Sequence, residues 1–191
     1  YWKRKMLEQI SDGSSFLDLA CGTGILTREI AEKFPNSKIV GIDITKSYLD
    51  VAKKNSSYFE NISFILDDAE EFKLDSKFDC ITASYLPKYC DPEILVKNCT
   101  THLKPGGKII FHDFTYPKNL VVRGLWNLFL TSLRLVGCFI PSWKDALIGL
   151  PKLIRRTKWL ESYSDVMKKN GLNVNRQYLT CGASAILTGT K

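Results

Sequence analysis

Short apolar runs alternate along the chain with segments in which apolar residues recur every three or four positions. Continuous apolar runs are typical of strands that are buried on both faces of a parallel sheet. The second spacing is typical of amphipathic helices that cover such a sheet. The alternation therefore predicts a doubly wound α/β fold, with helices on both faces of a mostly parallel sheet.

The predicted elements follow one another regularly as far as residue 115. We expect strands over Ser15–Ala20, Lys38–Ile42, Ile62–Leu66, Phe78–Ala83 and Lys108–Phe114, the last of them after a turn at Lys104–Gly107. We expect helices over Ile25–Phe34, Ser47–Lys54 and Pro92–Leu103, with Thr45 as the N-cap of the second helix.

The last third of the chain departs from this order. Residues 119–153 are rich in Leu, Trp, Phe and Arg, and Pro141 and Pro151 interrupt them. This pattern predicts two or three helices inserted at about residues 117–160, before the sheet resumes. A helix closed by Gly171 and an antiparallel pair of strands then complete a seven-stranded sheet within a single domain of residues 1–191. The helix and the two strands are expected over Ser162–Asn170, Leu172–Leu179 and Ala183–Thr190.

The composition is that of an ordinary globular protein, with 45% apolar and 25% charged residues. No apolar run approaches the roughly 18 residues that a membrane-spanning helix needs. The six cysteines are scattered and form no CxxC pair, so we expect buried thiols in a reducing compartment, with no disulfide framework and no metal site. They are Cys21, Cys80, Cys90, Cys99, Cys138 and Cys181. A cytoplasmic location follows from these features.

The net charge of +7 is unevenly distributed. Residues 1–115 contain 15 Lys+Arg and 17 Asp+Glu, whereas residues 116–191 contain 12 and 3. In residues 119–158 the basic side chains are mixed with large apolar ones, which suits peripheral contact with anionic lipid headgroups. The alternative is that these helices roof the sheet and present a solvated basic face. Nucleic acid is not the expected partner, because no recognised module or aromatic platform is present.

The strongest local signal is the loop Asp18-Leu-Ala-Cys-Gly-Thr-Gly24, which lies directly between a predicted strand and a predicted helix. Gly22 and Gly24 permit a sharp turn and close approach of a ligand to the backbone. A dinucleotide-binding loop needs a third glycine, but Thr27 occupies that position. Asp18 adds a negative charge that suits a cationic sulfonium better than a pyrophosphate. The loop therefore favours S-adenosylmethionine as the ligand.

Two further acidic positions follow the next two strands. Asp43 ends the second strand, 43 − 24 = 19 residues beyond Gly24, where a carboxylate can accept hydrogen bonds from ribose hydroxyls. Asp67 and Asp68 follow the third strand and suit an adenine amino group. The alternatives are a helix cap at Asp43 and a solvated turn at Asp67–Asp68, but three acids on three successive strand tips favour a cofactor site. The predicted cofactor-binding residues are Asp18, Ala20, Cys21, Gly22, Thr23, Gly24, Asp43, Ile44, Asp67, Asp68, Ala69 and Ser84.

Together with these motifs, the segments FDCITAS, LKPGG and YLTCGASAILTGTK and the tripeptide Trp2-Lys3-Arg4 give the chain a family resemblance. It resembles the Rossmann-like methyltransferases and, more finely, the ubiquinone/menaquinone biosynthesis C-methyltransferases, over nearly its whole length. The resemblance implies S-adenosylmethionine as cofactor and the ring carbon of a demethylated polyprenyl quinol as methyl acceptor. Two positions depart from the family pattern. Cys21 replaces the first glycine of Gly-Gly-Thr-Gly, and Lys88-Tyr89 replaces an Arg-Asn pair near the acceptor.

Methylation at carbon needs an electron-rich acceptor, so a base near the acceptor hydroxyl would help. The candidates lie at the tips of the fourth and fifth strands, and the catalytic residues are expected among Lys88, Tyr89, His112 and Asp113, with Ser84 and Tyr85 beside them. His112 is either a titrating group or a strand histidine packed against a helix. Lys88 either stabilises a phenolate or is an exposed loop charge, and Asp113 matches an acidic position of the family.

Two other functions stay open at this point. One is O- or N-methylation of another small molecule or a phospholipid. The other is a partner subunit that binds the cofactor without catalysis, which the Lys88-Tyr89 departure keeps in view.

Overall fold

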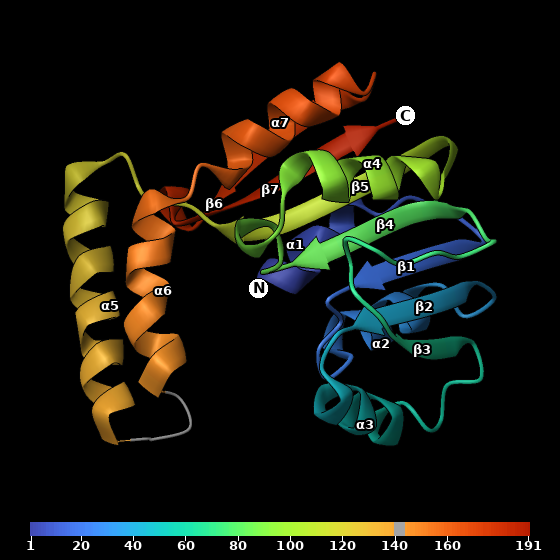
Figure 1. The fold of residues 1–191 in the computed structure, drawn as a ribbon, viewed down its shortest axis with the longest axis horizontal. Coiled ribbons are helices and arrows are strands. Elements are labelled where there is room, and N and C mark those ends of the chain that lie inside the picture. Colours follow the sequence, from blue (N-terminus) through green and yellow to red (C-terminus); the bar gives the residue numbers. More distant parts are fainter. Residues whose placement is uncertain (140–143) are drawn as a thin grey trace.

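The computed structural model describes residues 1–139 and 144–191. It contains one seven-stranded sheet in the order β3-β2-β1-β4-β5-β7-β6 (Figure 1). Every strand except β7 points the same way, because β7 pairs antiparallel with both β5 and β6. This confirms the predicted α/β fold and its final antiparallel strands. The strands are β1 Ser15–Leu19, β2 Lys38–Asp43, β3 Ile62–Leu66, β4 Phe78–Ser84, β5 Leu103–Phe114, β6 Asn173–Leu179 and β7 Ser184–Thr190.

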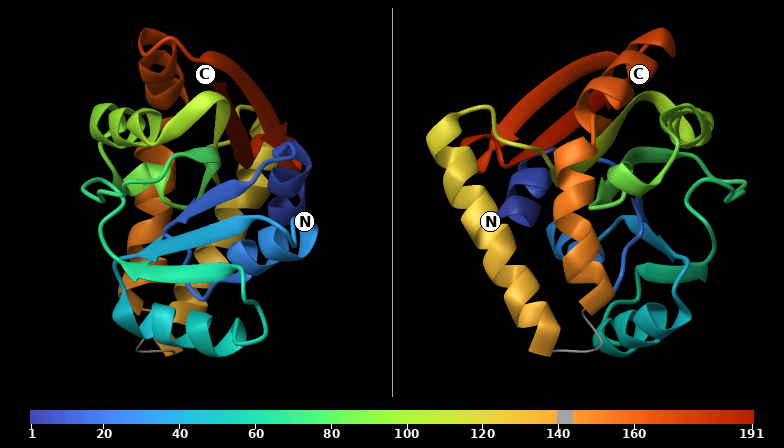
Figure 2. Two further views of the ribbon diagram at one scale, coloured as in Figure 1. Left: turned by 90° about the vertical axis from the view of Figure 1, so that its right-hand side faces the viewer. Right: turned by 60° about the vertical axis from the view of Figure 1, so that its left-hand side comes forward.

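Helices cover both faces of this sheet. The helices are α1 Trp2–Gln9, α2 Ile25–Lys33, α3 Lys46–Asn55, α4 Pro92–Thr101, α5 Leu120–Phe139, α6 Lys144–Arg156 and α7 Trp159–Lys169, with short 3₁₀ turns η1 Pro87–Tyr89 and η3 Thr180–Gly182. In the left view of Figure 2, α4 and α7 lie on one side of the sheet and α1 and α2 on the other. The core divides accordingly, since Leu17 and Leu19 pack with α4 and α7 while Phe16 packs with α1 and α2.

The predicted insertion forms a helical hairpin of α5 and α6. It stands beside the edge of the sheet toward which β1 and β4 point (Figure 1). Leu130 of α5 and Ile154 of α6 are buried. Pro151 lies inside α6, so the predicted break there is wrong, and Pro141 falls outside the described residues. No helix in the described ranges is long and apolar enough to cross a membrane.

Helix α1 was not predicted from the sequence. Its indole Trp2 Nε1 donates a hydrogen bond to Thr180 Oγ1 at 2.8 Å, and Lys33 Nζ donates to the carbonyl oxygens of Leu7 (2.7 Å) and Ile10 (3.0 Å) at its other end. These contacts come from residues far away in the sequence. A helix this short depends on such tertiary contacts for its stability, so the local sequence alone gives little indication of it.

The fifth strand begins earlier than predicted. Residues 104–107 belong to β5, which starts at Leu103, so the predicted turn is part of the strand. The pairing of β5 with β4 shifts register between Phe78 and Cys80, and Gly106 has a φ of +75°. A register shift of this kind, as in a β-bulge, allows the segment that contains Gly106 to remain hydrogen-bonded within the sheet.

Two predicted helix ends have different outcomes. Gly171 has a φ of +76° and closes α7 with two hydrogen bonds, from its own N–H to Lys168 O and from Leu172 N–H to Met167 O, both at 3.0 Å. This is a Schellman motif, as glycine after a helix favours. Thr45 does precede α3, but its hydroxyl makes no capping hydrogen bond.

The cysteine prediction holds in part. The thiols of Cys21, Cys80 and Cys99 are buried and free, whereas Cys90 is partly exposed. Cys181 is exposed in the η3 turn, so the prediction of burial is wrong there. The side-chain environment of Cys138 falls outside the described part of the chain.

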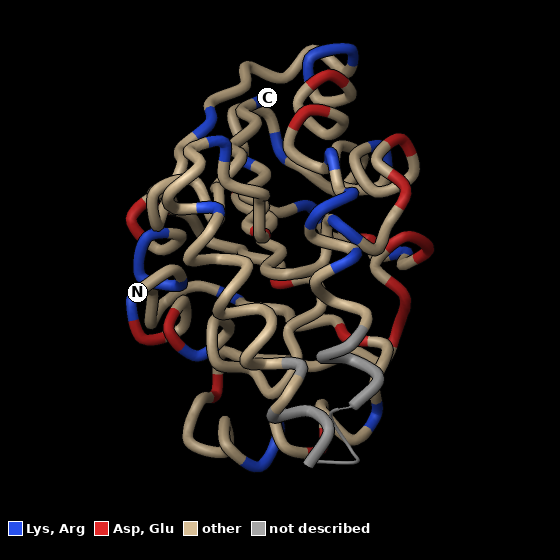
Figure 3. Tube along the Cα trace, turned by 90° about the vertical axis from the view of Figure 1, so that its left-hand side faces the viewer, with Lys and Arg blue, Asp and Glu red and all other residues tan. Residues whose placement is uncertain are grey.

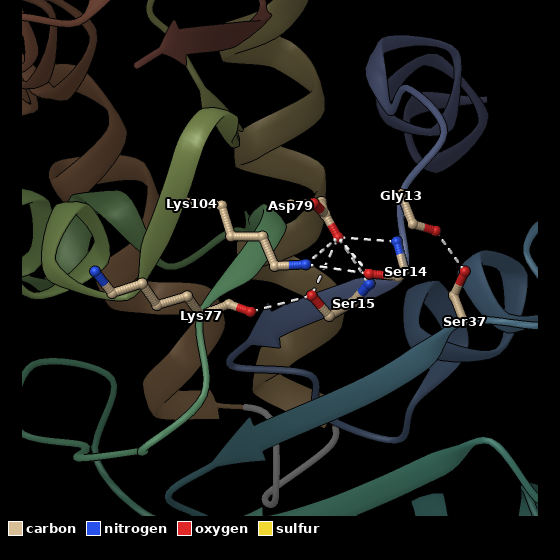
Figure 4. A network of polar contacts seen from close by, with 7 residues as sticks. All are labelled: Gly13, Ser14, Ser15, Ser37, Lys77, Asp79 and Lys104. Carbon is tan, nitrogen blue, oxygen red and sulfur yellow. Dashed lines mark hydrogen bonds and ion pairs between the residues drawn. The ribbon is translucent and has the colours of Figure 1, made fainter.

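A polar network ties the strands together at the edge where β1, β4 and β5 begin (Figure 4). The Asp79 carboxylate accepts hydrogen bonds from the backbone N–H groups of Ser14 (2.8 Å) and Ser15 (2.9 Å) and from Lys104 Nζ (2.8 Å). Burial raises the pKa of Asp79, but these donors outweigh it and lower the pKa to about 2. Gly13 must be a glycine, because a Cβ there would lie 2.7 Å from Asp79 Cβ.

Candidate cofactor and active site

Two hollows flank Ala20 at the carboxyl ends of the parallel strands. The first, of about 270 Å³, contains Asp18, Ala20, Cys21, Gly22, Thr23 and Ser84 in its lining. The second, of about 200 Å³, contains Ala20, Asp43, Ile44, Asp67, Asp68 and Ala69. The structure thus brings every predicted cofactor residue except Gly24 to one of two adjoining hollows. Gly24 instead precedes α2 with a φ of +75°.

The loop between β1 and α2 is held in a strained, open shape. Ala20 has a φ of +51°, which is uncommon for a residue with a Cβ, and Gly22 has a φ of +56°. The N–H of Gly22 donates to Asp43 Oδ2 at 2.8 Å, and the N–H of Cys21 donates to Ile42 O at 2.9 Å. A Cβ on Gly22 would meet no atom within 4 Å, so this backbone faces open space. The loop therefore presents bare peptide groups to a ligand.

Asp18 is a buried carboxylate without a cationic partner. Strand alternation points it to the face of the sheet that α2 covers, and its residue is 2% exposed. Its oxygens accept hydrogen bonds from the hydroxyls of Thr27 (2.7 Å) and Thr82 (2.9 Å). Among the described residues, no Lys, Arg or His forms an ion pair with it. Burial outweighs the two hydroxyl donors and the nearby charge of Lys3, and it raises the pKa of Asp18 to about 6. A cationic ligand group in the first hollow would compensate this charge.

Asp43 lines the second hollow and connects the loop after β1 to the start of α3. Its Oδ2 accepts from Gly22 N–H and its Oδ1 accepts from Thr45 N–H, both at 2.8 Å. Asp68 Oδ1 accepts from Glu70 N–H at 2.8 Å, as in an Asx-turn. The helix-cap alternative for Asp43 is wrong, because the N-cap of α3 is Thr45, whereas Asp68 does begin a turn, as its alternative expected. These contacts do not compete with binding, since each carboxylate can accept further hydrogen bonds and lines the hollow.

Lys88 is not an exposed loop charge, so that alternative is wrong. Lys88 Nζ lies 2.9 Å from Asp113 Oδ1, and the two side chains are 2% and 0% exposed. Lys88 Nζ also donates to Tyr85 O at 2.6 Å, and Lys88 N–H donates to Asp113 Oδ2 at 3.1 Å. Burial lowers the pKa of Lys88 and raises that of Asp113, and the ion pair opposes both shifts. The pair joins the turn after β4 to β5 beneath the surface.

His112 is a fully buried strand histidine. Its Nδ1 lies 3.1 Å from Ser84 Oγ, and its ring lies 5.8 Å from that of Trp2 in α1 and 5.0 Å from that of Tyr85. Burial is the main cause that lowers the pKa of His112 to about 4, so the ring is neutral at pH 7. This matches the packed alternative, and His112 stands behind Ser84, which does line the first hollow.

Two tyrosines line the hollows, whereas the other candidates for a catalytic role do not. Tyr89 is 65% exposed and lines the second hollow, with Lys88 Nζ 4.4 Å from its ring centroid. Tyr85 lines the first hollow with a φ of +66°, a second strained residue at a strand tip. Lys88, His112 and Asp113 are absent from the lining of both hollows, so Tyr89 is the one predicted catalytic residue that meets the space described here.

Sequence reasoning missed four residues of the first hollow, namely Lys3, Ile25, Leu26 and Tyr48. Lys3 belongs to the tripeptide Trp2-Lys3-Arg4, so a signal was present, but nothing in that motif indicates that α1 reaches the tip of β1. Tyr48 follows Asp43 closely, in the first turn of α3.

A third and larger hollow, of about 790 Å³, lies at the base of the hairpin. Thr115 and Tyr116 after β5, Trp159 at the start of α7 and Tyr178 of β6 line it, with Lys158. It contains none of the predicted site residues. Size therefore does not identify the cofactor site, which rests on the carboxylates and the open loop.

The fold and these strand-tip carboxylates are those of an α/β enzyme of one class, the S-adenosylmethionine-dependent methyltransferases. A family profile described as "Methyltransferase domain" matches residues 10–134, and the chain belongs to that family. Among curated proteins, it is 30% identical over 200 aligned positions to the ubiquinone/menaquinone biosynthesis C-methyltransferase UbiE of Hahella chejuensis. This alignment covers 100% of the chain and 80% of that protein. It is also 32% identical over 166 positions to a malonyl-[acyl-carrier protein] O-methyltransferase of Halalkalibacterium halodurans, covering 80% of this chain and 61% of that protein.

Solved structures agree on the fold. The pyocyanin biosynthetic protein PhzM matches 99% of this chain with a TM-score of 0.71 at 19% identity. Phosphoethanolamine N-methyltransferase 2 of Haemonchus contortus, in complex with S-adenosyl-L-methionine, matches 100% of it with a TM-score of 0.73 at 14% identity. The chain spans 54% and 52% of those two proteins, respectively.

Proposed function

We propose that this methyltransferase binds S-adenosylmethionine across the two hollows beside Ala20. Asp18 would face the cationic methionine end, Asp43 the ribose hydroxyls, and Asp67 and Asp68 the adenine amino group. The observation that carries this proposal is the uncompensated carboxylate of Asp18, buried next to an open glycine loop. The neighbouring acids of the second hollow support it.

The cofactor, when bound, supplies an electrophilic methyl group. The protein positions this methyl group against the acceptor and excludes water from the site. The strained peptide at Ala20 and the N–H anchored by Asp43 keep the loop in one shape before binding. Tyr85 and Tyr89 place aromatic rings at the mouths of the hollows, where they would exclude water and contact an acceptor ring. The Lys88–Asp113 ion pair would act as a positioning device for these tyrosines, since Lys88 is bonded to the Tyr85 carbonyl.

For the acceptor, we propose the ring carbon of a demethylated polyprenyl quinol. The supporting observation is that similarity to the UbiE relative extends over the whole chain, including the α5–α6 hairpin. That hairpin stands beside the edge of the sheet toward which β1 and β4 point (Figure 1), and residues at the ends of these two strands line the first hollow. An insertion in this place is well situated to select an acceptor.

The outer face of α5 supports a lipidic acceptor. Several large apolar side chains of α5 are 49–73% exposed, namely Leu120, Val121, Leu125, Leu128, Phe129 and Leu135. No Asp or Glu occurs from residue 116 to residue 144. Figure 3 views the molecule from the side of the hairpin, where uncharged and basic segments predominate in front. We propose that this face contacts an anionic membrane surface peripherally.

A second candidate is O-methylation of a carboxyl or hydroxyl acceptor. It is favoured by the similarity to the malonyl-[acyl-carrier protein] O-methyltransferase and by the presence of Lys88-Tyr89 where the quinone family has Arg-Asn.

The test is methyl transfer from labelled S-adenosylmethionine to a panel of demethylated quinols, phenols, carboxylic acids and phospholipids. Label on the ring carbon of a quinol is expected. Label only on oxygen or nitrogen would refute the quinol assignment and leave the cofactor site intact. Cofactor binding without turnover on any acceptor would instead favour a non-catalytic partner subunit.

A further inference from the structure

We propose that Lys3 binds the carboxylate of the cofactor's amino-acid end and so makes the first hollow a receptor for a zwitterion. The inference rests on the proposed cofactor site and adds a residue of opposite charge to it. S-adenosylmethionine ends in an α-amino acid, which carries an ammonium and a carboxylate on one carbon. A site that compensates only the cationic groups would leave the carboxylate without a partner.

Lys3 and Asp18 line the same hollow from opposite elements. Lys3 comes from α1 and Asp18 from the end of β1, and the glycine loop and Ser84 line the same hollow. Lys3 is partly buried. Among the described residues, Lys3 Nζ has neither a hydrogen-bond nor an ion-pair partner, although several carbonyls and carboxylates satisfy other lysines of the chain. A partly buried ammonium without a partner beside an unpaired carboxylate is the complement of a zwitterion.

The charges around Lys3 come from several elements. Asp18 of β1 and Glu29 of α2 favour its ammonium, whereas Arg28 of α2 opposes it. Burial is the largest influence and lowers the pKa of Lys3. The charge of Lys3 also lowers the pKa of His112, which is neutral at pH 7. A ligand carboxylate would therefore relieve the cost of burying this ammonium without displacing an existing ion pair.

The position of Lys3 is fixed by its neighbours and not by a flexible terminus. Trp2 Nε1 is bonded to Thr180 Oγ1, and the Trp2 ring packs edge-on against Phe114 with centroids 5.6 Å apart. Met6, one turn further along α1, is fully buried. A charged group held on an anchored helix is pre-organised, so less freedom is lost when it binds.

The experiment measures binding by calorimetry, using S-adenosylhomocysteine and decarboxylated S-adenosylhomocysteine, which retains the amine. Wild type is expected to bind the carboxylate-bearing ligand at least about tenfold more tightly, and Lys3→Met is expected to lose that preference. The decarboxylated ligand should bind Lys3→Met within about twofold of wild type. Lys3→Arg should retain the preference, because guanidinium also pairs with carboxylates. Lys5→Met is the matched control, since Lys5 lies on the same helix and pairs with Glu8 at 2.7 Å.

Equal weakening of both ligands by Lys3→Met would overturn the proposal, because Lys3 would then act only through the fold or through Asp18. Undiminished binding of S-adenosylhomocysteine to Lys3→Met would overturn it as well. If wild type bound neither ligand, the proposed cofactor site itself would be refuted, so the two failures are distinguishable. Thermal unfolding of each variant separates loss of binding from loss of fold.

Discussion

Replacing Asp18 with asparagine should stabilise the protein without ligand and weaken its binding of S-adenosylmethionine. The substitution keeps the shape of the side chain and removes its charge. Hydrogen bonding can also be kept. Thr27 would donate to the new amide oxygen, and the new amide nitrogen would donate to Thr82 Oγ1. The Thr82 hydroxyl could then donate to the Leu17 carbonyl oxygen, which already lies 3.3 Å away.

The magnitude follows from the pKa of Asp18, which burial raises from its ordinary value of 3.8 to about 6. A shift of one unit corresponds to about 1.4 kcal/mol, so the ionised carboxylate costs the folded state about 3 kcal/mol at pH 7. Because the folded state binds the proton more tightly than the unfolded state, this cost appears as pH rises from about 4 to about 6. Asparagine removes the cost at every pH, and imperfect hydrogen bonding would reduce the gain to roughly 1–3 kcal/mol.

The assay is urea unfolding of wild type and Asp18→Asn at pH 7 and near pH 4, together with calorimetric titration of S-adenosylhomocysteine at pH 7. At pH 7 the variant should be more stable and bind the ligand at least about tenfold more weakly. Near pH 4 the difference in stability should nearly vanish. Asp79→Asn is the matched control, since the donors around Asp79 lower its pKa to about 2 and its removal should destabilise the protein at pH 7.

The reasoning would be refuted if Asp18→Asn were less stable than wild type at pH 7, or if the difference in stability were the same at both pH values. A more stable variant that bound the ligand as tightly as wild type would keep the electrostatic account of Asp18 and exclude it from the cofactor site.

Three further predictions concern other parts of the molecule. Asp43→Ala should weaken S-adenosylhomocysteine binding by about 10- to 150-fold in calorimetry, and unchanged affinity would remove Asp43 from the site. Lys88→Met should lower the free energy of urea unfolding by about 3–5 kcal/mol, because it leaves the Asp113 carboxylate buried and unpaired, and a loss below about 1 kcal/mol would contradict that account. The pair of substitutions Leu125→Glu and Leu128→Glu should reduce sedimentation with phosphatidylglycerol vesicles several-fold while cofactor affinity stays constant. Equal sedimentation of variant and wild type would argue against membrane contact through α5.

The arrangement of the cofactor residues could be predicted from the sequence because it depends on local order. Asp18 and Asp43 lie at the carboxyl ends of β1 and β2, Asp68 follows β3, and these three strands are adjacent in the sheet. Parallel strands bring their carboxyl ends to one edge, so residues that are regularly spaced in the sequence converge in space. The backbone strain at Ala20 could not be predicted in this way, because it arises from hydrogen bonds between loops.

The surroundings of the catalytic candidates could not be predicted, for a different reason. Whether Lys88 is solvated or buried depends on Asp113, which lies 25 residues away. The helix of Trp2 similarly depends on Thr180, 178 residues away in the sequence. Burial and pairing of this kind are properties of the assembled fold, and a single sequence pattern does not contain them.

Some buried or partly buried carboxylates of this protein have a lysine partner, whereas Asp18 has none, and this difference indicates where a ligand binds. Asp113 is compensated by Lys88 and Asp79 by Lys104, so neither pair needs anything from outside the chain. Asp18 has two hydroxyl donors and, among the described residues, no ion-pair partner, and the charge of Lys3 does not offset the effect of its burial. A fold gains nothing from an uncompensated buried carboxylate, since a neutral residue of the same shape would be more stable. The presence of that carboxylate beside an open glycine loop is best explained by a cation that arrives with the ligand.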